Sequence, residues 1–548
     1  MQYSAAAAMG VALGSCGQAL SSTPGVLRRT TLRLTEVSGV FGYPTPFAYI
    51  GTPGYLRMIN MFDTLLWEDG EGNLLPWLAE SHSASADKMT YTFQLRSGLL
   101  WSDGQPVTAE DVAFTFNYFN NASLTPLTIA QAFGVNTAQA TGPLTVQVQL
   151  AAPSVTFEKT VAGALPIVPK HVWSAVSDPT TVNDTKYLVG TGPYRMTSYD
   201  QNSGNMSFAA NDAYFLGKPF IKELDLVAVG DEFSSLRANA IDLLDVVEAS
   251  TQALVPFRAD STTYHVIEGP PSFTYPLFFN LSQGGPLADV KFRQAVVTAI
   301  NRSDMVQRLL GGQGAPGNPG FLPPSHPDYT QVTQYSYSVS GANAMLDAAG
   351  YTKGSDGVRR THDGSPLSFK LYTENSPVPP SVDLIVADLK AVGVNITVQS
   401  VDLPSLFGIT VSGKFDMALT LFPGPGGTSV SSDPDYLRLV FSSHGFPGPN
   451  RAVGYKNSQF DALAEQQQTV FDSGQRKQLI AQMQRILAQD LPAIPLYYGN
   501  SYAVARKSVY DNLAYTPGGF ATGITSVTNK QLFITGQRSG LQIVKTAS

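Results

Sequence analysis

Asp433 and Asp435 are two carboxylates one residue apart, an arrangement that could perform acid–base chemistry. In a secreted hydrolase, one carboxylate would hold a proton for donation while the other stayed ionised and accepted one. Acidic residues of this kind more often face solvent or cap a helix. The pair alone therefore does not establish an enzyme.

The other signatures of catalysis or cofactor binding are missing or incomplete. The sequence has no serine with glycine two residues away on each side, no His-Glu-x-x-His, and no phosphate loop ending in Gly-Lys-Ser/Thr. Residues 312–317 fit a dinucleotide-loop glycine pattern, but they follow a predicted helix rather than a strand and include a proline. The histidines lack metal-ligand spacing; they are His82, His171, His265, His326, His362 and His444. The sequence therefore favours a binding protein over an enzyme, with no metal and no cofactor.

The clearest local structure lies between residues 61 and 120. Residues 91–96 alternate apolar and polar side chains, which predicts a half-buried strand. Ser-Asp-Gly at 102–104 is typical of a turn. Thr108 stands three residues before Asp111, a capping pair that predicts a helix start. The apolar face of that helix is Val112, Phe116 and Phe119.

This order of elements resembles the signature region of the family 5 solute-binding proteins of ABC importers, the extracytoplasmic receptors for dipeptides, oligopeptides and nickel. The matching residues are Leu75-Pro76-Trp77-Leu78-Ala79-Glu80-Ser81, Tyr91-Thr92-Phe93-Gln94-Leu95-Arg96, Gly98, Trp101-Ser102-Asp103-Gly104 and Pro106-Val107-Thr108-Ala109-Glu110-Asp111-Val112. The resemblance implies an α/β fold, a two-lobed clamshell of the periplasmic-binding-protein type with an extra subdomain in the first lobe.

The length of 548 residues is too great for a single core, which agrees with two lobes. After residue 280, helical stripes alternate with strands and indicate an α/β lobe. Strand-like runs at 275–281 and 493–498 predict two crossings between the lobes. The predicted organisation is 1–30 signal and tether, 31–280 plus 499–548 lobe I with a subdomain inserted at about 76–190, and 281–498 lobe II.

The composition excludes some classes of partner. Hydrophobic residues make up 43% and charged residues 14%, which is typical of an ordered globular protein. A net charge of −7 argues against nucleic acid, because few cations are available to displace counterions from phosphates. Beyond the N-terminal run, no window approaches the ~18 apolar residues of a membrane span.

The only cysteine, Cys16, follows a short apolar run, although no Lys or Arg precedes that run. Leu13-Gly14-Ser15-Cys16 resembles a bacterial lipobox, which implies a lipidated N-terminal cysteine after cleavage. The alternative is a leader or buried cysteine without lipid. With the lipobox, we expect a lipoprotein of the cell envelope, periplasmic or anchored on the outer face of the cytoplasmic membrane.

The resemblance also assigns candidate ligand-binding residues. The loop after the first strand carries ligand-binding residues in the family, and here that loop is predicted over residues 40–55. In the second lobe, the loop at 422–436 and residues 450–455 are the corresponding positions. The predicted residues are Thr52, Gly54, Tyr55, Tyr275, Phe422, Thr428, Asp433, Asp435, Asn450 and Tyr455.

One departure from the family bears on the solute. Peptide-binding members carry a Gly-Trp pair and then an aspartate that pairs with the free amino group of the peptide. Here the pair is Leu421-Phe422, and counting back from Asp433 places Val430 at the aspartate position. Since a buried ammonium without an anionic partner is strongly disfavoured, Val430 favours a sugar or another polar solute, unless Asp433 or Asp435 serves instead.

The predicted function is the substrate-binding component of an ABC importer. It would capture oligopeptides or a similar solute by lobe closure and deliver them to the permease subunits as a monomer. The alternatives are an oligosaccharide binder of the same fold, a secreted hydrolase, and a receptor that signals without transport.

Overall fold

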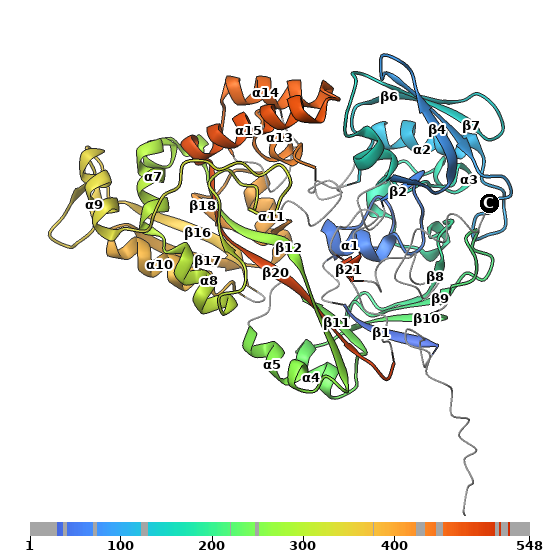
Figure 1. Cartoon of the computed structure of the whole chain (residues 1–548), viewed down its shortest axis with the longest axis horizontal. Helices are drawn as coiled ribbons and strands as arrows, with labels where there is room; N and C mark the ends of the chain where they lie inside the picture. The colour runs from blue at the N-terminus through green and yellow to red at the C-terminus, as the bar shows by residue number, and fades with distance from the viewer. Residues whose placement is uncertain are drawn as a thin grey trace, which may run out of the picture.

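Two lobes stand on either side of a pair of long strands in the computed structural model (Figure 1). The structure describes residues 30–36, 41–68, 74–121, 130–219, 221–246, 251–375, 378–423, 433–444, 453–509, 515–516 and 524–525. We call lobe I the part built on the large core that includes residues 32–226, and lobe II the part whose cores lie within residues 277–497.

The long strands β12 (Tyr264–Phe279) and β20 (Ala493–Arg506) pair antiparallel and extend through both lobes. They are the predicted strand runs at 275–281 and 493–498. Among the described residues they belong to a 12-stranded sheet whose main path is β17-β16-β18-β12-β20-β11-β1-β10-β9-β8. The pairing of β12 with β20 shifts register at three places between Gly269 and Pro276. The predicted limits of the lobes, at 280 and 499, stay predictions.

Lobe I contributes β1 (Thr31–Glu36), β8 (Tyr194–Tyr199), β9 (Met206–Ala210), β10 (Glu223–Ala228) and β11 (Leu243–Val246) to this sheet. Its other elements are α1 (Gly51–Met58), β2 (Leu66–Glu68), β3 (Leu74–Pro76), the π-helix η2 (Phe157–Ala162) and α3 (Lys170–Trp173). Helices α4 (Glu232–Arg237) and α5 (Thr251–Ala259) pack with β12 and β20 around a small separate core.

A second sheet of lobe I has the order β4-β5-β7-β6, with bounds Ala79–Ala84, Thr90–Leu95, Thr145–Leu150 and Val135–Ala140. The strand predicted at 91–96 is β5, whose side chains alternate in burial. The predicted helix is α2 (Ala109–Asn121), and the Asp111 carboxylate accepts a hydrogen bond from the Thr108 amide at 2.9 Å. The capping prediction is confirmed.

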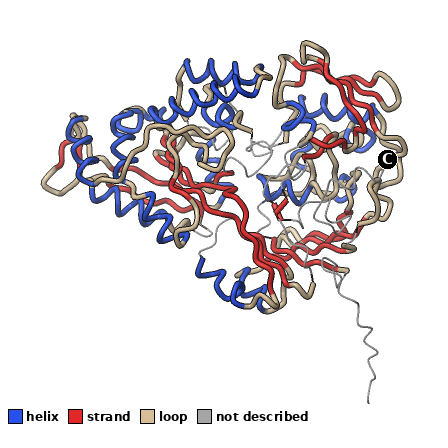
Figure 2. The backbone as a smooth tube through the Cα atoms, in the orientation of Figure 1, coloured by secondary structure: helices blue, strands red, loops and turns tan. Residues whose placement is uncertain are grey.

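Lobe II is built on three parallel strands, β16 (Ser368–Glu374), β17 (Asn395–Val401) and β18 (Met417–Leu419). Helices lie along both sides of these strands (Figure 2). The helices of lobe II are α6 (Gly285–Ala288), α7 (Val290–Ala299), α8 (Arg302–Leu310), α9 (Val339–Ala348), α10 (Ser381–Ala391), α11 (Leu403–Val411), α13 (Tyr436–Phe441), α14 (Ser458–Thr469) and α15 (Ser473–Asp490). The α/β prediction for this lobe is confirmed.

Short strands complete the fold. They are β13 (Ala315–Pro316), β14 (Thr352–Lys353), β15 (Arg359–Arg360), β19 (Phe422–Pro423), β21 (Tyr515–Thr516) and β22 (Ile524–Thr525). β13 pairs with β20 directly after α8, and a Cβ on Gly317 would lie 1.8 Å from the Pro495 carbonyl oxygen. The glycines at 312–317 therefore allow this segment to pack against β20.

One prediction about lobe I is wrong. The sequence predicted a loop as far as Tyr55, but helix α1 begins at Gly51. Pro53 lies in the first turn, where the amide groups have no partner within the helix, so proline is tolerated there. The many glycines and prolines obscured this helix start. No helix among the described residues combines the length and apolar character that crossing a bilayer demands.

Candidate ligand-binding site

The carboxyl ends of the lobe II strands point toward lobe I. β12 runs from lobe I at Tyr264 to Phe279 in lobe II, and β18 is antiparallel to it. β16 and β17 run parallel to β18. All three strands therefore return toward lobe I and end at Glu374, Val401 and Leu419. In open α/β sheets, ligands bind outside the carboxyl ends of the strands, which makes this edge the candidate site.

Tyr275 lies on β12 at this edge. Leu277 pairs with Leu419 and Thr274 with Phe422, so the same register sets Tyr275 level with Leu421. The Tyr275 ring is half-buried and lies 5.9 Å from the ring of Tyr497, centroid to centroid. The structure thus brings the predicted residues Tyr275 and Phe422 to neighbouring strands. The Phe422 side chain lies outside the described residues.

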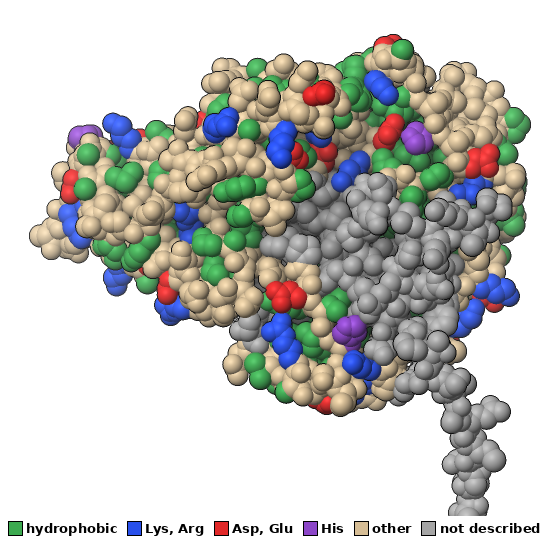
Figure 3. Space-filling view, viewed as in Figure 1, with side chains coloured by type: hydrophobic (Ala, Val, Ile, Leu, Met, Phe, Trp, Pro, Cys, Tyr) green, Lys and Arg blue, Asp and Glu red, His purple; other side chains and the backbone are tan. Residues whose placement is uncertain are grey.

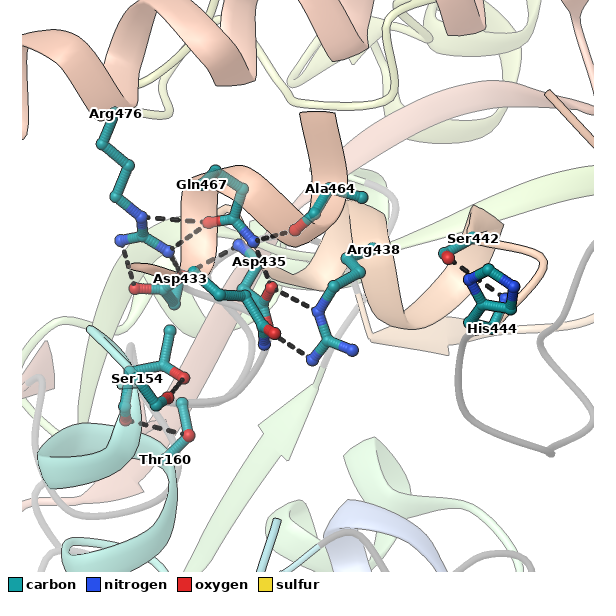
Figure 4. A network of polar contacts seen from close by, with 12 residues as sticks. Ser154, Thr160, Asp433, Asp435, Arg438, Ser442, His444, Ala464, Gln467 and Arg476 are labelled. Carbon is teal, nitrogen blue, oxygen red and sulfur yellow. Dashed lines mark hydrogen bonds and ion pairs between the residues drawn. The ribbon is translucent and has the colours of Figure 1, made fainter. Parts of the chain in front are cut away.

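Asp433 and Asp435 form part of a buried polar network within lobe II (Figure 4). The Arg476 guanidinium donates two hydrogen bonds to Asp433, at 2.5 and 3.0 Å. The Arg438 guanidinium donates two to Asp435, both at 2.8 Å. Gln467 links the two ion pairs, because it accepts from Arg476 and donates to Asp435.

The electrostatics of Asp433 favour its charged form. Burial would raise the pKa of this carboxyl, but the hydrogen bonds and charge of Arg476 outweigh burial and hold the pKa below its usual value. A carboxylate that is already neutralised by a guanidinium has little charge left for a solute ammonium. The same partner disfavours the protonated acid that a hydrolase would need.

The network lies where the lobes touch. Figure 4 draws Ser154 and Thr160 of lobe I below Asp433, and the charge of Lys159, between them in the chain, helps to lower the pKa of Asp433. The Val155 amide donates a hydrogen bond to the Gln468 carbonyl in α14 at 2.8 Å. Lys88 lies over the ring of Phe471, 5.6 Å from its centroid. Asp433 and Asp435 thus stabilise the part of lobe II that contacts lobe I.

Other predicted residues lie in the cores of the separate lobes. Tyr55 is fully buried in lobe I and donates a hydrogen bond to the Ala164 carbonyl at 2.8 Å; burial raises its pKa. A Cβ on Gly54 would lie 2.6 Å from the Phe41 carbonyl oxygen, so the helix packs there through its backbone. Tyr455 donates to Asp490 at 2.8 Å within lobe II. These contacts give each residue a structural role, and ligand binding by them stays a prediction.

Several predicted positions cannot be placed. The backbone of Thr52 lies in α1, but its side chain is outside the described residues. Cys16, Thr428, Val430 and Asn450 also lie outside them.

Sequence reasoning missed Glu374, the last residue of β16. Its half-buried carboxylate lies at the candidate edge and accepts a hydrogen bond from the Leu421 backbone amide. An acidic residue at the end of an alternating strand was the signal that could have found it. Among the described residues, no three His, Cys, Asp or Glu side chains gather closely enough to hold a metal ion.

Comparison with known proteins gives a consistent assignment. A model of the family described as bacterial extracellular solute-binding proteins, family 5 Middle, matches residues 73–447. Protein XP55 of Streptomyces lividans is 28% identical over 500 residues, covering 89% of this chain and 88% of its own. The oligopeptide-binding protein AppA of Bacillus subtilis is 25% identical over 484 residues, covering 85% and 86%.

Solved structures share the fold. The structure of AppA from Bacillus subtilis in complex with a nonapeptide matches with a TM-score of 0.76 and 22% identity, covering 94% of this chain and 98% of AppA. NikZ from Campylobacter jejuni in complex with Ni(L-His) matches with a TM-score of 0.74 and 23% identity, covering 88% and 95%. These matches confirm the predicted two-lobed fold.

The function predicted from the sequence, the substrate-binding component of an ABC importer, is confirmed by the same comparisons. The match to the family model covers more than half of the chain and includes the residues on which the resemblance was based. This protein belongs to family 5 of the bacterial extracellular solute-binding proteins.

Proposed function

We propose that this chain captures an oligopeptide or a similar solute outside the cytoplasm and delivers it, chemically unchanged, to the permease of an ABC importer. The observation that carries the proposal is the arrangement of two lobes on β12 and β20, with the carboxyl ends of β16, β17 and β18 directed at lobe I. A solute bound at that edge would contact both lobes only when they are close together.

Lobe closure supplies the physical basis for recognition. A ligand shifts the equilibrium between open and closed forms only by its difference in affinity for them. Val155 contacts Gln468 and Lys88 contacts Phe471, so these two pairs join the lobes. They would add to the stability of the closed form, which the permease would then recognise.

An oligopeptide is favoured over other solutes by the relatives. AppA of Bacillus subtilis, which is similar over most of the chain, is named as an oligopeptide-binding protein. The same fold also accommodates Ni(L-His) in NikZ and agropinic acid in AgaA, so the fold alone does not choose the solute. An oligosaccharide or another polar solute is therefore the second candidate, motivated by Val430 at the predicted aspartate position.

The solute would lie beside Tyr275 and β19, with contributions from the loop that follows β19 and from α1. Thr52, Phe422, Thr428 and Asn450 remain proposed contacts within this site. Tyr275 would offer an aromatic surface to the apolar part of the solute.

For the location, we propose that a lipid on Cys16 anchors the protein to the outer face of the cytoplasmic membrane; the alternative is a periplasmic protein. The basis is the lipobox-like sequence Leu13-Gly14-Ser15-Cys16. The anchor would keep the protein close to its permease. We also propose that the protein is a monomer.

Native purification followed by mass spectrometry of the released small molecules tests the function. We expect a ladder of peptides bound at up to one equivalent. An oligosaccharide would refute the peptide part, and conversion of the released compound by the purified protein would refute a purely binding role. A protein that carries no solute, and binds none from a peptide digest, would refute capture of peptides altogether.

A further inference from the structure

Glu374 is the last residue of β16, at the edge where the proposed solute lies. The preceding residue, Thr373, pairs with Leu419 at the end of β18. The chain then continues from β18 to Leu421, whose amide donates a hydrogen bond to the Glu374 carboxylate. Leu421 is level with Tyr275 on β12, and β18 lies between β12 and the β16 strand that ends at Glu374.

Among the described residues, no Lys, Arg or His forms an ion pair with Glu374, unlike Asp433 and Asp435. Asp433 and Asp435 each have a guanidinium partner within lobe II, and Asp242 of lobe I has Arg33. Among the residues that the structure describes, Glu374 forms no ion pair, and the Leu421 amide is its hydrogen-bond partner. Burial raises the pKa of this carboxyl, since water that would solvate the charge is partly excluded. A half-buried carboxylate in this condition favours a positively charged partner.

We propose that Glu374 binds a cationic group of the solute, an ammonium or a guanidinium, and thereby selects solutes that carry positive charge at the end next to β16. The proposal rests on the proposed function and deepens it by naming the chemistry of the solute. It also supplies an anion for a chain in which Val430 stands at the predicted aspartate position.

Lobe closure would strengthen this interaction. When lobe I covers the edge, water is excluded and the effective dielectric constant around Glu374 falls. The attraction between the Glu374 carboxylate and a cationic group then becomes stronger. A cationic solute would then favour the closed form more than a neutral solute of the same shape, which is the differential affinity that capture requires.

The test compares the wild-type protein with Glu374→Gln and with the control Asp388→Asn. Asp388 is also half-buried in lobe II and also has a raised pKa, but it lies on α10 and accepts a hydrogen bond from the Asn301 amide at 2.9 Å. Each protein, stripped of solute, is incubated with an elastase digest of casein and with the same digest after acetylation of its amines. Retained peptides are identified and quantified by mass spectrometry.

The wild-type protein and Asp388→Asn should retain peptides from the untreated digest, and should retain arginine-free acetylated peptides at least tenfold less. Glu374→Gln should retain at least tenfold less of the untreated peptides. Its melting temperature should equal or exceed that of the wild type, because the change removes a poorly solvated charge. A loss of binding with an intact melting transition supports a binding role over a structural one.

Two results would overturn only the assignment of Glu374. They are unchanged retention by Glu374→Gln, and equal retention of acetylated and untreated peptides by the wild type. If the wild-type protein retains no peptide from either digest, the proposed function is refuted and the role of Glu374 falls with it. A Glu374→Gln protein that binds less only because it melts at a lower temperature also contradicts the proposal.

Discussion

Replacing Asp433 by Asn should destabilise lobe II, because Asp433 neutralises Arg476 in a largely buried pair. The side chains of Arg476 and Asp433 are only 13% and 11% exposed. Removing one partner of a buried ion pair costs about 3–5 kcal/mol, since the other charge is left uncompensated. We expect about 3 kcal/mol for Asn, the lower end, because its amide oxygen can still accept one hydrogen bond from Arg476.

The assay is differential scanning calorimetry of the solute-free protein, followed by urea denaturation. For a unit the size of lobe II, ~3 kcal/mol corresponds to a decrease of roughly 6–12 °C in melting temperature. Asp212→Asn is the matched control, because Asp212 pairs with Lys222 at 3.1 Å on the surface, where both side chains are well exposed. A surface pair of this kind contributes no more than about 1 kcal/mol.

A double variant tests the cause. Adding Arg476→Met to Asp433→Asn removes the uncompensated charge, so part of the lost stability should return. The reasoning is refuted if the losses of the two single variants simply add. It is also refuted if Asp433→Asn melts like the wild type but no longer retains peptide, because Asp433 would then contact the solute instead of stabilising the lobe.

The pH dependence of this pair follows from the lowered pKa of Asp433. A carboxyl whose folded-state pKa is below its unfolded value of about 3.9 contributes stability above that value. This contribution is lost as the pH falls from about 4 through the folded-state pKa. The stability difference between wild type and Asp433→Asn should therefore shrink in that range.

Three further predictions concern other parts of the chain. In lobe I, buried Asp63 accepts hydrogen bonds from Trp77, Thr191 and Tyr214 at 2.8, 2.9 and 3.1 Å. Asp63→Ala should therefore lower the free energy of unfolding by roughly 3–6 kcal/mol, because three buried donors lose their acceptor. A loss below ~1 kcal/mol in urea titrations would contradict this prediction. Burial raises the pKa of Glu232 to about 7. The melting temperature of the native protein should therefore decrease as the pH rises from about 4.5 through 7, and Glu232→Gln should abolish that decrease. Cys16→Ser should release the protein from membranes on cell fractionation, whereas the control Ser22→Ala should not. If both variants stay on the membrane to the same extent, the lipid anchor is ruled out.

Local patterns in the sequence determined much of the fold. The alternation at 91–96 formed β5, and Asp111 caps α2 as its spacing from Thr108 predicted. Asp289 likewise accepts a hydrogen bond from the Lys291 amide at the start of α7. These features depend on residues within one turn or one strand, so their cause lies in the local chain.

The sequence did not indicate contacts between residues that lie far apart in the chain. The spacing of Asp433 and Asp435 did not indicate that Arg476, 43 positions away in the chain, pairs with Asp433. Tyr55 looked like a residue of an open loop, but it lies in a helix and bonds to Ala164, 109 positions away. A polar residue becomes available to a ligand only if the fold leaves it without a partner, and the spacing of neighbours does not carry that information.

The sequence by itself determined the family, the α/β character of the chain and the order of many of its elements, because turns, caps and apolar periodicity are local properties. Only the tertiary structure decided which acidic side chains of the described residues form an ion pair with an arginine and which do not. Asp433 and Glu374 are both partly buried acidic residues of lobe II, yet Asp433 pairs with an arginine of α15, whereas Glu374 interacts with the backbone amide of Leu421. That difference comes from the packing of segments far apart in the chain, since burial and pairing together set the energy of a charge.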